Sequence, residues 1–157
     1  MEQQENKISY VKVWERFNTV LTPGHRAELR RVRNPDDLRD IPALYRLLAG
    51  MRPTRRMLQL IFCLPYAGHR EKAEAIGVQL AKAQINEKRL FQMVRSDPPN
   101  DLIYLRRILQ QVKPVVDWND FGSLIFFWEK KDKRRLLEDF FLAQYSDKDN
   151  KEKGKAS

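Results

Sequence analysis

The sequence predicts an all-α protein of roughly eight or nine helices. Hydrophobic residues recur at steps of three and four along nearly the whole chain, which is the period of a helix with one buried face. Prolines and helix-capping side chains stand at the starts of several of these segments. No segment alternates with the period of two that marks a half-buried strand, and no internal repeat indicates a solenoid. With 157 residues, 42% of them hydrophobic, the chain can bury a core of ordinary size.

In the first part of the chain, the helices are predicted from the spacing of their apolar residues and from the capping or breaking residues at their ends. Residues 10–21 form one apolar stripe that a Pro-Gly pair ends, and a short helix follows. The motif Asn-Pro-Asp-Asp at residues 34–37 offers a capping side chain, a proline for a first turn and two acids that a helix N-terminus favours. Residues 43–49 form another helix before Gly50. The segment 55–64 is apolar on nearly all sides, so we expect it to be central and buried.

The second part of the chain repeats these signals. A weaker helix is expected over residues 76–83, a second helix capped by Asn86 is expected to extend to residue 94, and the clearest amphipathic pattern covers residues 100–112. Asp117 is expected to cap a helix over residues 118–128. Asp132 is expected to cap a last helix that runs to about Tyr145.

The predicted folded body spans residues 7–147 as one all-α domain. A polar stretch at residues 67–72 is the best candidate for an internal connection, and a division there would give lobes at residues 7–66 and 72–147. The last ten residues, 148–157, hold one apolar side chain among charges, which predicts a disordered tail.

The chain carries 30 Lys and Arg against 21 Asp and Glu, and this net charge of +9 is typical of a protein that meets a polyanion. The tail contributes only +2, from four lysines and two carboxylates, so the body keeps +7. No segment approaches the roughly 20 apolar residues of a membrane span. The N-terminus has no secretory signal, and the single cysteine cannot form an internal disulfide. We expect a cytoplasmic protein with no membrane partner.

The inventory of reactive side chains argues against an enzyme. His25 and His69 are the only histidines, and neither shows metal-ligand spacing with the other or with Cys63. Zinc-protease, paired-cysteine and phosphate-binding glycine motifs are absent. Cys63 lies in an apolar helix, where a core role is the simplest interpretation. We predict no catalytic residue, no metal, no cofactor and no small-molecule substrate.

Basic residues gather in five clusters, at residues 30–33, 52–56, 88–95, 106–107 and 130–135. The first falls near a helix C-terminus, where the helix dipole favours cations in any case. The second and last fall at helix N-termini, where the dipole disfavours positive charge and where backbone N–H groups attract phosphate. Binding to the phosphates of a nucleic acid would explain why cations stand at these helix N-termini. Solvated charge, or pairing with Glu129, Asp132 and Glu138, is the alternative.

Several runs also resemble a known family. The run at residues 29–47, LRRVRNPDDLRDIPALYRL, is similar to the small-subunit family, often called CasB, of the type I-E CRISPR surveillance complex Cascade. Shorter segments agree in the same order, at residues 61–64, 85–95, 105–109, 114–118 and 136–140. Together they extend from about Tyr10 to Tyr145, which is nearly the whole predicted body.

The resemblance implies an all-α, non-catalytic subunit of a ribonucleoprotein. It implies contacts with guide RNA, target DNA, the backbone and large subunits of Cascade, and a second copy of the chain. It also implies that basic residues stabilise the displaced strand of the R-loop. Carried over position by position, the expected contact residues are Arg31, Arg52, Arg89, Arg95, Arg107, Lys130, Lys131 and Lys133.

Two other functions remain open at the level of sequence. A free-standing DNA-binding regulator could use a helix-turn-helix within residues 83–95, and it would prefer one duplex sequence. A purely structural bridging subunit would use its charge for solubility and for docking to acidic partners, and it would show little salt-dependent affinity for nucleic acid.

Overall fold

The computed structural model describes the backbone of residues 8–156 and the side chains of residues 8–146. Its elements are α2 (Tyr10–Thr19), α3 (Pro23–Arg30), η1 (Pro35–Asp40), α4 (Pro42–Leu48), α5 (Arg55–Cys63), η2 (Leu64–Tyr66), β1 (Gly68–His69), α6 (Ile76–Lys82), α7 (Glu87–Arg95), α8 (Asn100–Val112), β2 (Val115–Val116), α9 (Trp118–Phe127) and α10 (Lys130–Ala156), where η marks a 3-10 helix. The all-α prediction is confirmed.

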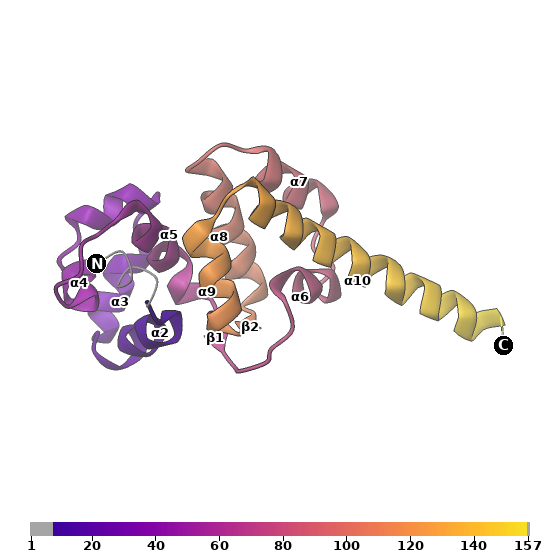
Figure 1. The fold of residues 1–157 in the computed structure, drawn as a ribbon, viewed down its shortest axis with the longest axis horizontal. Coiled ribbons are helices and arrows are strands. Elements are labelled where there is room, and N and C mark those ends of the chain that lie inside the picture. Colours follow the sequence, from indigo (N-terminus) through magenta and orange to yellow (C-terminus); the bar gives the residue numbers. More distant parts are fainter. Residues whose placement is uncertain (1–7, 157) are drawn as a thin grey trace.

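The helices form two groups joined through α8 and α9 (Figure 1). At one end lie α2 to α5, and at the other α6 and α7 pack against the first part of α10. α8 packs against α7 and also against α5. α9 packs against both α2 and α5, and it also meets α10. No helix among the described residues is long and apolar enough to cross a bilayer.

The helix α5 lies at the centre of the core, as its all-round apolar pattern predicts. Every residue from Met57 to Cys63 is buried, including the polar Gln59. The side-chain amide of Gln59 donates hydrogen bonds to the carbonyl oxygens of Ile125 and Phe126, at 3.1 and 3.2 Å. A buried amide must find partners, and here they are the otherwise unbonded carbonyls near the end of α9. Gln59 therefore joins the two helices by more than apolar contact.

Two glycines allow helices to approach closely, one against the backbone of its neighbour and the other against a side chain. A Cβ on Gly77 of α6 would lie 2.4 Å from the carbonyl oxygen of Leu136 in α10. A Cβ on Gly122 of α9 would lie 2.4 Å from the Cβ of Tyr10 in α2. These two contacts set how closely α10 and α9 approach the rest of the fold.

One short strand pair differs from the sequence prediction, which gave no strand. β1 and β2 run parallel, with Gly68 opposite Val115 and His69 opposite Val116. The Gly68 N–H donates to Pro114 O and the Arg70 N–H donates to Val116 O, each at 2.9 Å. Strands of two residues are too short to show an alternating pattern, so periodicity could not have found them. The pair fixes the polar stretch at residues 67–72 to the end of α8.

The helix ends follow the predicted caps with one exception. Asp117 caps α9 as expected, accepting from the Asn119 N–H at 3.0 Å. α10 begins at Lys130, before Asp132, and Asp132 instead accepts from the Glu129 N–H at 2.8 Å. A carboxylate inside the first turn satisfies a free N–H as well as one at the cap position does. α10 runs as a helix to Ala156, and the disorder expected for residues 148–157 stays a prediction.

Candidate nucleic-acid interface

Seven of the eight expected contact residues lie at the surface. Arg89 is half-buried and the others are exposed: Arg31, Arg52, Arg95, Arg107, Lys130 and Lys131. Within the described part of the chain the ion pairs are Arg39 with Asp36, Lys82 with Glu74, and Lys133 with Asp101. None of the seven surface cations is therefore neutralised by a described carboxylate.

Arg89 and Arg107 lie on the same side of the packed pair α7 and α8. The Arg89 guanidinium donates a hydrogen bond to the side chain of Gln111. Gln111 follows Arg107 by one helical turn, so the two share a face of α8. This bond therefore places the Arg89 head group beside the face that carries Arg107.

Arg95 and the first residues of α10 form the other flank of this region. The guanidinium of Arg95 lies 5.2 Å from the ring centroid of Phe91, which itself packs against Phe141 of α10 at 5.7 Å. The Lys133 ammonium donates to the carbonyl oxygen of Ser96, the residue after Arg95, at 3.1 Å. The start of α10, with Lys130 and Lys131, therefore lies against the end of α7. We call these surface cations of α7, α8 and the start of α10, namely Arg89, Arg95, Arg107, Lys130 and Lys131, the basic ridge.

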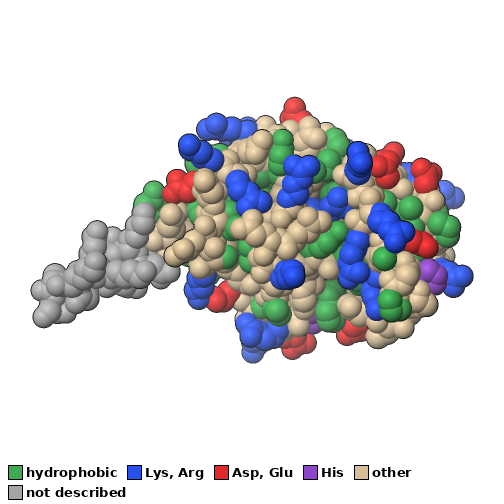
Figure 2. Space-filling view, turned by 180° about the vertical axis from the view of Figure 1, so that it is seen from behind, with side chains coloured by type: hydrophobic (Ala, Val, Ile, Leu, Met, Phe, Trp, Pro, Cys, Tyr) green, Lys and Arg blue, Asp and Glu red, His purple; other side chains and the backbone are tan. Residues whose placement is uncertain are grey.

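Arg31 and Arg52 lie apart from this ridge. Arg31 caps the C-terminus of α3, and Arg52 precedes α5, so both belong to the other group of helices. Figure 2 shows Lys and Arg side chains spread over one face of the molecule, with Asp and Glu mainly toward its edges. The expected contact residues thus form a broad basic surface with one dense part.

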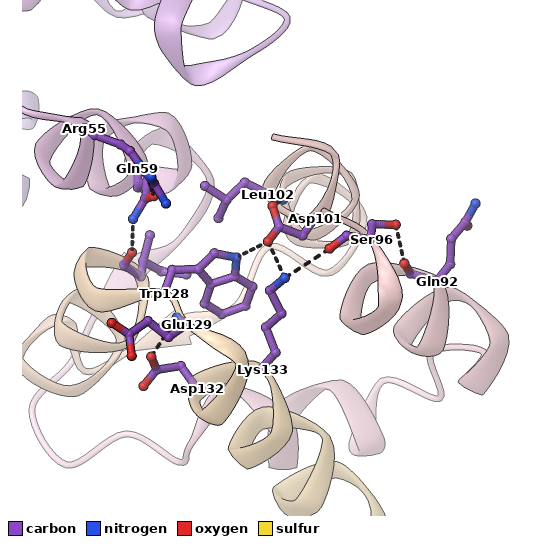
Figure 3. A network of polar contacts seen from close by, with 11 residues as sticks. Arg55, Gln59, Gln92, Ser96, Asp101, Leu102, Trp128, Glu129, Asp132 and Lys133 are labelled. Atoms are coloured by element: carbon purple, nitrogen blue, oxygen red, sulfur yellow. Dashed lines mark hydrogen bonds and ion pairs between the residues drawn. The ribbon is translucent and has the colours of Figure 1, made fainter. Parts of the chain in front are cut away.

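Lys133 is a correction to the predicted site, because it is buried inside the fold. Its side chain is 10% exposed, and its ammonium lies 2.5 Å from a carboxylate oxygen of Asp101, which is fully buried (Figure 3). The indole N–H of Trp128 donates to the same carboxylate oxygen at 3.0 Å. A lysine held by a buried carboxylate and a carbonyl cannot reach a phosphate from this position. In the sequence Asp101 resembled an ordinary acid in a first helical turn, and nothing local linked it to Lys133.

Arg106 is the second cation that the structure buries. It is 9% exposed, and its guanidinium lies 3.9 Å from the ring centroid of Phe62 in α5. Its Nε and Nη1 make no hydrogen bond to any described residue. Burial lowers the pKa of Arg106 from its usual value. Periodicity over residues 100–112 predicts that Arg106 and Arg107 both point away from the centre of the apolar face, but in the structure only Arg107 reaches solvent.

The predicted placement of cations at helix N-termini is confirmed. Arg55 and Arg56 are the first residues of α5 and Lys130 is the first of α10. Arg55 Nε donates to Gln59 Oε1 at 3.4 Å, and Arg56 lies 4.9 Å from the ring centroid of Phe127. The arginines of α5 therefore have partners within the fold, while Lys130 has no carboxylate partner among residues 8–146.

The cysteine and the two histidines are the side chains most able to carry chemistry, and each is buried or hydrogen-bonded within the fold. Cys63 is fully buried, and burial raises the pKa of its thiol to about 12, which is the opposite of activation. His25 Nδ1 accepts from the Thr22 N–H at 3.3 Å, and His69 Nδ1 accepts from the Trp118 N–H at 3.1 Å. No group of three or more metal-ligating side chains occurs among the described residues.

Comparisons with known proteins point to one family. Residues 25–141 match the family model of CRISPR-associated protein Cse2 (CRISPR_cse2). The Cascade subunit CasB of Escherichia coli (strain K12) is 35% identical, over 90% of this chain and 96% of its own. A chain in the crystal structure of E. coli Cascade bound to a PAM-containing dsDNA target superposes with a TM-score of 0.80 at 36% identity, covering 87% of this chain and 99% of that one. The chain therefore belongs to the Cse2 family, the family of the Cascade subunit CasB.

Proposed function

We propose that this chain is a non-catalytic, cytoplasmic subunit of a Cascade complex that holds the phosphate backbones of guide RNA and target DNA and stabilises the R-loop. The observation that carries the proposal is the basic ridge: five cations from α7, α8 and α10, none of which has a carboxylate partner among the described residues. A relative with the same fold lies in a Cascade complex that is bound to target DNA.

The chemistry of the ridge suits phosphate rather than base edges. Arginine and lysine neutralise phosphates regardless of sequence, and the guide RNA supplies sequence specificity by base pairing. Lys130 also stands where the N–H groups of the first turn of α10 point outward. The backbone and large subunits of Cascade, and a second copy of the chain, are its expected protein partners.

The proposal is tested in the assembled complex with the triple variant Arg107→Ala, Lys130→Ala, Lys131→Ala. The complex should assemble at normal stoichiometry, while the R-loop on a matched target should dissociate faster than in the wild type. The matched control is Lys82→Ala, which removes a cation that Glu74 already neutralises at 2.7 Å. This control should leave the lifetime of the R-loop unchanged.

Each alternative function gives a different result in the same experiment. If the triple variant fails to enter the complex, the ridge docks against protein and the chain is a bridging subunit. If the isolated chain prefers one duplex sequence over unrelated duplexes of equal length, it is a regulator. An unchanged R-loop lifetime in a fully assembled variant complex refutes the phosphate contacts.

A further inference from the structure

A hollow of about 530 Å³ lies outside the basic ridge, where the end of α8 meets α2 and η2. Side chains of Trp14, Asn18, Arg30, Tyr66, Gln110 and Lys113 line it, and the backbone from Leu64 to Gly68 contributes to its wall. Its volume falls within the roughly 300–1,000 Å³ of small-ligand sites. The hollow is therefore large enough for a flat ring system with its substituents.

Two aromatic side chains in this hollow are held by their polar edges. The indole N–H of Trp14 donates to the carbonyl oxygen of Ala67 at 3.0 Å. The hydroxyl of Tyr66 donates to the carbonyl oxygen of Arg30 at 3.3 Å. Both rings are only half-buried, so the protein fixes their orientation without enclosing them. Rigid, partly open aromatic rings are the stacking platforms that single-strand-binding proteins use.

The hollow is also positive. No carboxylate lines it, and its two cations, Arg30 and Lys113, are exposed and make no ion pair with a described residue. The buried guanidinium of Arg106 lies 5.8 Å from the ring centroid of Tyr66, with Nε and Nη1 unbonded within the described part of the chain. The hollow between α6, α9 and α10 is the reverse case, because its lining carries a single arginine and five acids: Glu74, Asp117, Asp120, Asp132 and Asp139.

Aromatic rings, amide groups and cations around one hollow are the features that bind a nucleotide. Stacking serves the base, the cations serve the phosphates on either side of it, and amides serve the polar edge of the base. The side chain of Gln110 makes no hydrogen bond to a described residue, and the side chain of Asn18 uses only its amide N–H, which donates to the carbonyl oxygen of Trp14. Both side chains therefore keep free hydrogen-bonding groups.

We propose that this hollow binds an unpaired nucleobase of a single-stranded nucleic acid, stacked on Trp14 or Tyr66, with its flanking phosphates at Arg30 and Lys113. The proposal rests on the proposed function, because it assumes that the chain meets a single strand. It adds a contact to the base where the ridge contacts only the backbone. A protein side chain as the occupant is a competing outcome that the test resolves.

The test compares two single strands that carry the same number of phosphates, using the full-length chain. One is oligothymidine of about 15 nucleotides and the other is its abasic analogue, which lacks only the bases. Wild-type protein should bind the thymidine strand about fivefold to tenfold more tightly. The Tyr66→Leu variant, and independently the surface pair Gln110→Ala with Lys113→Gln, should reduce this preference while circular dichroism melting confirms the fold.

The basic ridge supplies the matched comparison. The variant Lys130→Ala, Lys131→Ala should weaken binding of both strands by the same factor and leave the preference for bases intact. Equal affinity of wild-type protein for both strands overturns the base site while leaving phosphate binding in place. A base preference that survives the Tyr66 and Gln110–Lys113 variants also overturns it.

Photocrosslinking gives a second readout. A strand carrying 5-iodouracil should crosslink to the peptide that contains Trp14 or to the peptide that contains Tyr66. Crosslinks confined to α7 and α10 refute the site. If Tyr66→Leu instead blocks entry into Cascade and leaves base preference unchanged, the occupant is a protein and the proposal is wrong. Absence of binding to either strand would count against the proposed function first.

Discussion

Lys133 of α10 and Asp101 of α8 form a buried ion pair, with 2.5 Å between the ammonium nitrogen and a carboxylate oxygen. Trp128 and Ser96 complete the network, so four segments of the chain meet at one carboxylate and one ammonium (Figure 3). The first turn of α10 is thereby fixed against the N-terminus of α8. Lys130 and Lys131 owe their position at the surface to this buried contact.

Breaking this pair from one side should destabilise the fold strongly. Lys133→Met leaves the buried carboxylate of Asp101 without its cation, which costs about 3–5 kcal/mol of unfolding free energy. The double variant Asp101→Leu, Lys133→Met removes both charges and should recover much of the loss. Urea denaturation measures both values. The exposed pair of Asp36 and Arg39 is the control, because disrupting it should cost less than about 1 kcal/mol.

Gly77 should not tolerate even a methyl group. A Cβ there would lie 2.4 Å from Leu136 O and 2.9 Å from the backbone nitrogen of Phe140, and neither atom can move without moving α10. We expect Gly77→Ala to lower the unfolding free energy by about 1–3 kcal/mol, with a lower thermal midpoint. Gly24→Ala is the matched control, because its Cβ would meet only Thr22 Oγ1 at 3.8 Å. Equal midpoints for the two variants would contradict the close packing of α6 on α10.

Cys63 should make stability fall at high pH. The thiol has a pKa of about 12 in the folded protein, above its ordinary value of 9.0, because burial disfavours the thiolate. Between these values the unfolded chain loses the proton and the folded chain keeps it, so folding is penalised as pH rises. The contribution of Cys63 is complete below about pH 9 and is lost progressively up to about pH 12, at up to about 1.4 kcal/mol per pH unit.

The Cys63 prediction is measured as the difference in pH dependence between wild type and Cys63→Ala. Lysine and tyrosine titrations contribute equally to both proteins and cancel in the comparison. Alkylation gives a second check, since the folded thiol should resist a maleimide at neutral pH and react once denaturant is added. Rapid labelling of the folded protein would show that the thiol is not enclosed.

The basic ridge should determine how binding responds to salt. Each phosphate contact that is lost should reduce the slope of log K against log salt by about 0.9 on duplex DNA and about 0.7 on single strands. Arg107→Ala and the Lys130→Ala, Lys131→Ala pair should each do so, for any sequence of DNA. Arg106→Met should leave the slope unchanged, because that guanidinium is buried. If the slope of log K against log salt changes in Arg106→Met and not in Arg107→Ala, then Arg106 contacts phosphate and Arg107 does not, which contradicts this prediction.

Sequence reasoning worked where the signal is local. The stripe in α2, the all-round apolar α5 and the Asp117 cap are patterns within one or two turns, and the structure confirms each. It did not find the burial of Lys133 and Arg106, because both lie in runs of charge that resemble exposed surface. What buries a long cation is a partner from another segment, Asp101 in one case and Phe62 in the other. Periodicity carries no information about such pairs.

The candidate base site likewise depends on contacts between distant segments, which local sequence patterns do not predict. The apolar stripe at residues 10–21 predicts that Trp14 faces the core, and no sequence pattern marks Tyr66; neither observation predicts the open hollow beside them. Gln110 and Lys113 lie beside that hollow because the end of α8 packs against η2, next to the pairing of β1 with β2. A site built from segments so far apart in the sequence leaves no local motif.

That strand pair also has a consequence for the order of folding. β1 and β2 are separated by the whole of α6, α7 and α8, so pairing them closes a long loop of chain. Closing such a loop costs conformational entropy that a few hydrogen bonds do not recover alone. Contacts of high sequence separation of this kind form slowly. We therefore expect amide protons of α5 to gain hydrogen-exchange protection before those of Gly68 and Arg70 during refolding, with the hollow at the end of α8 assembled last.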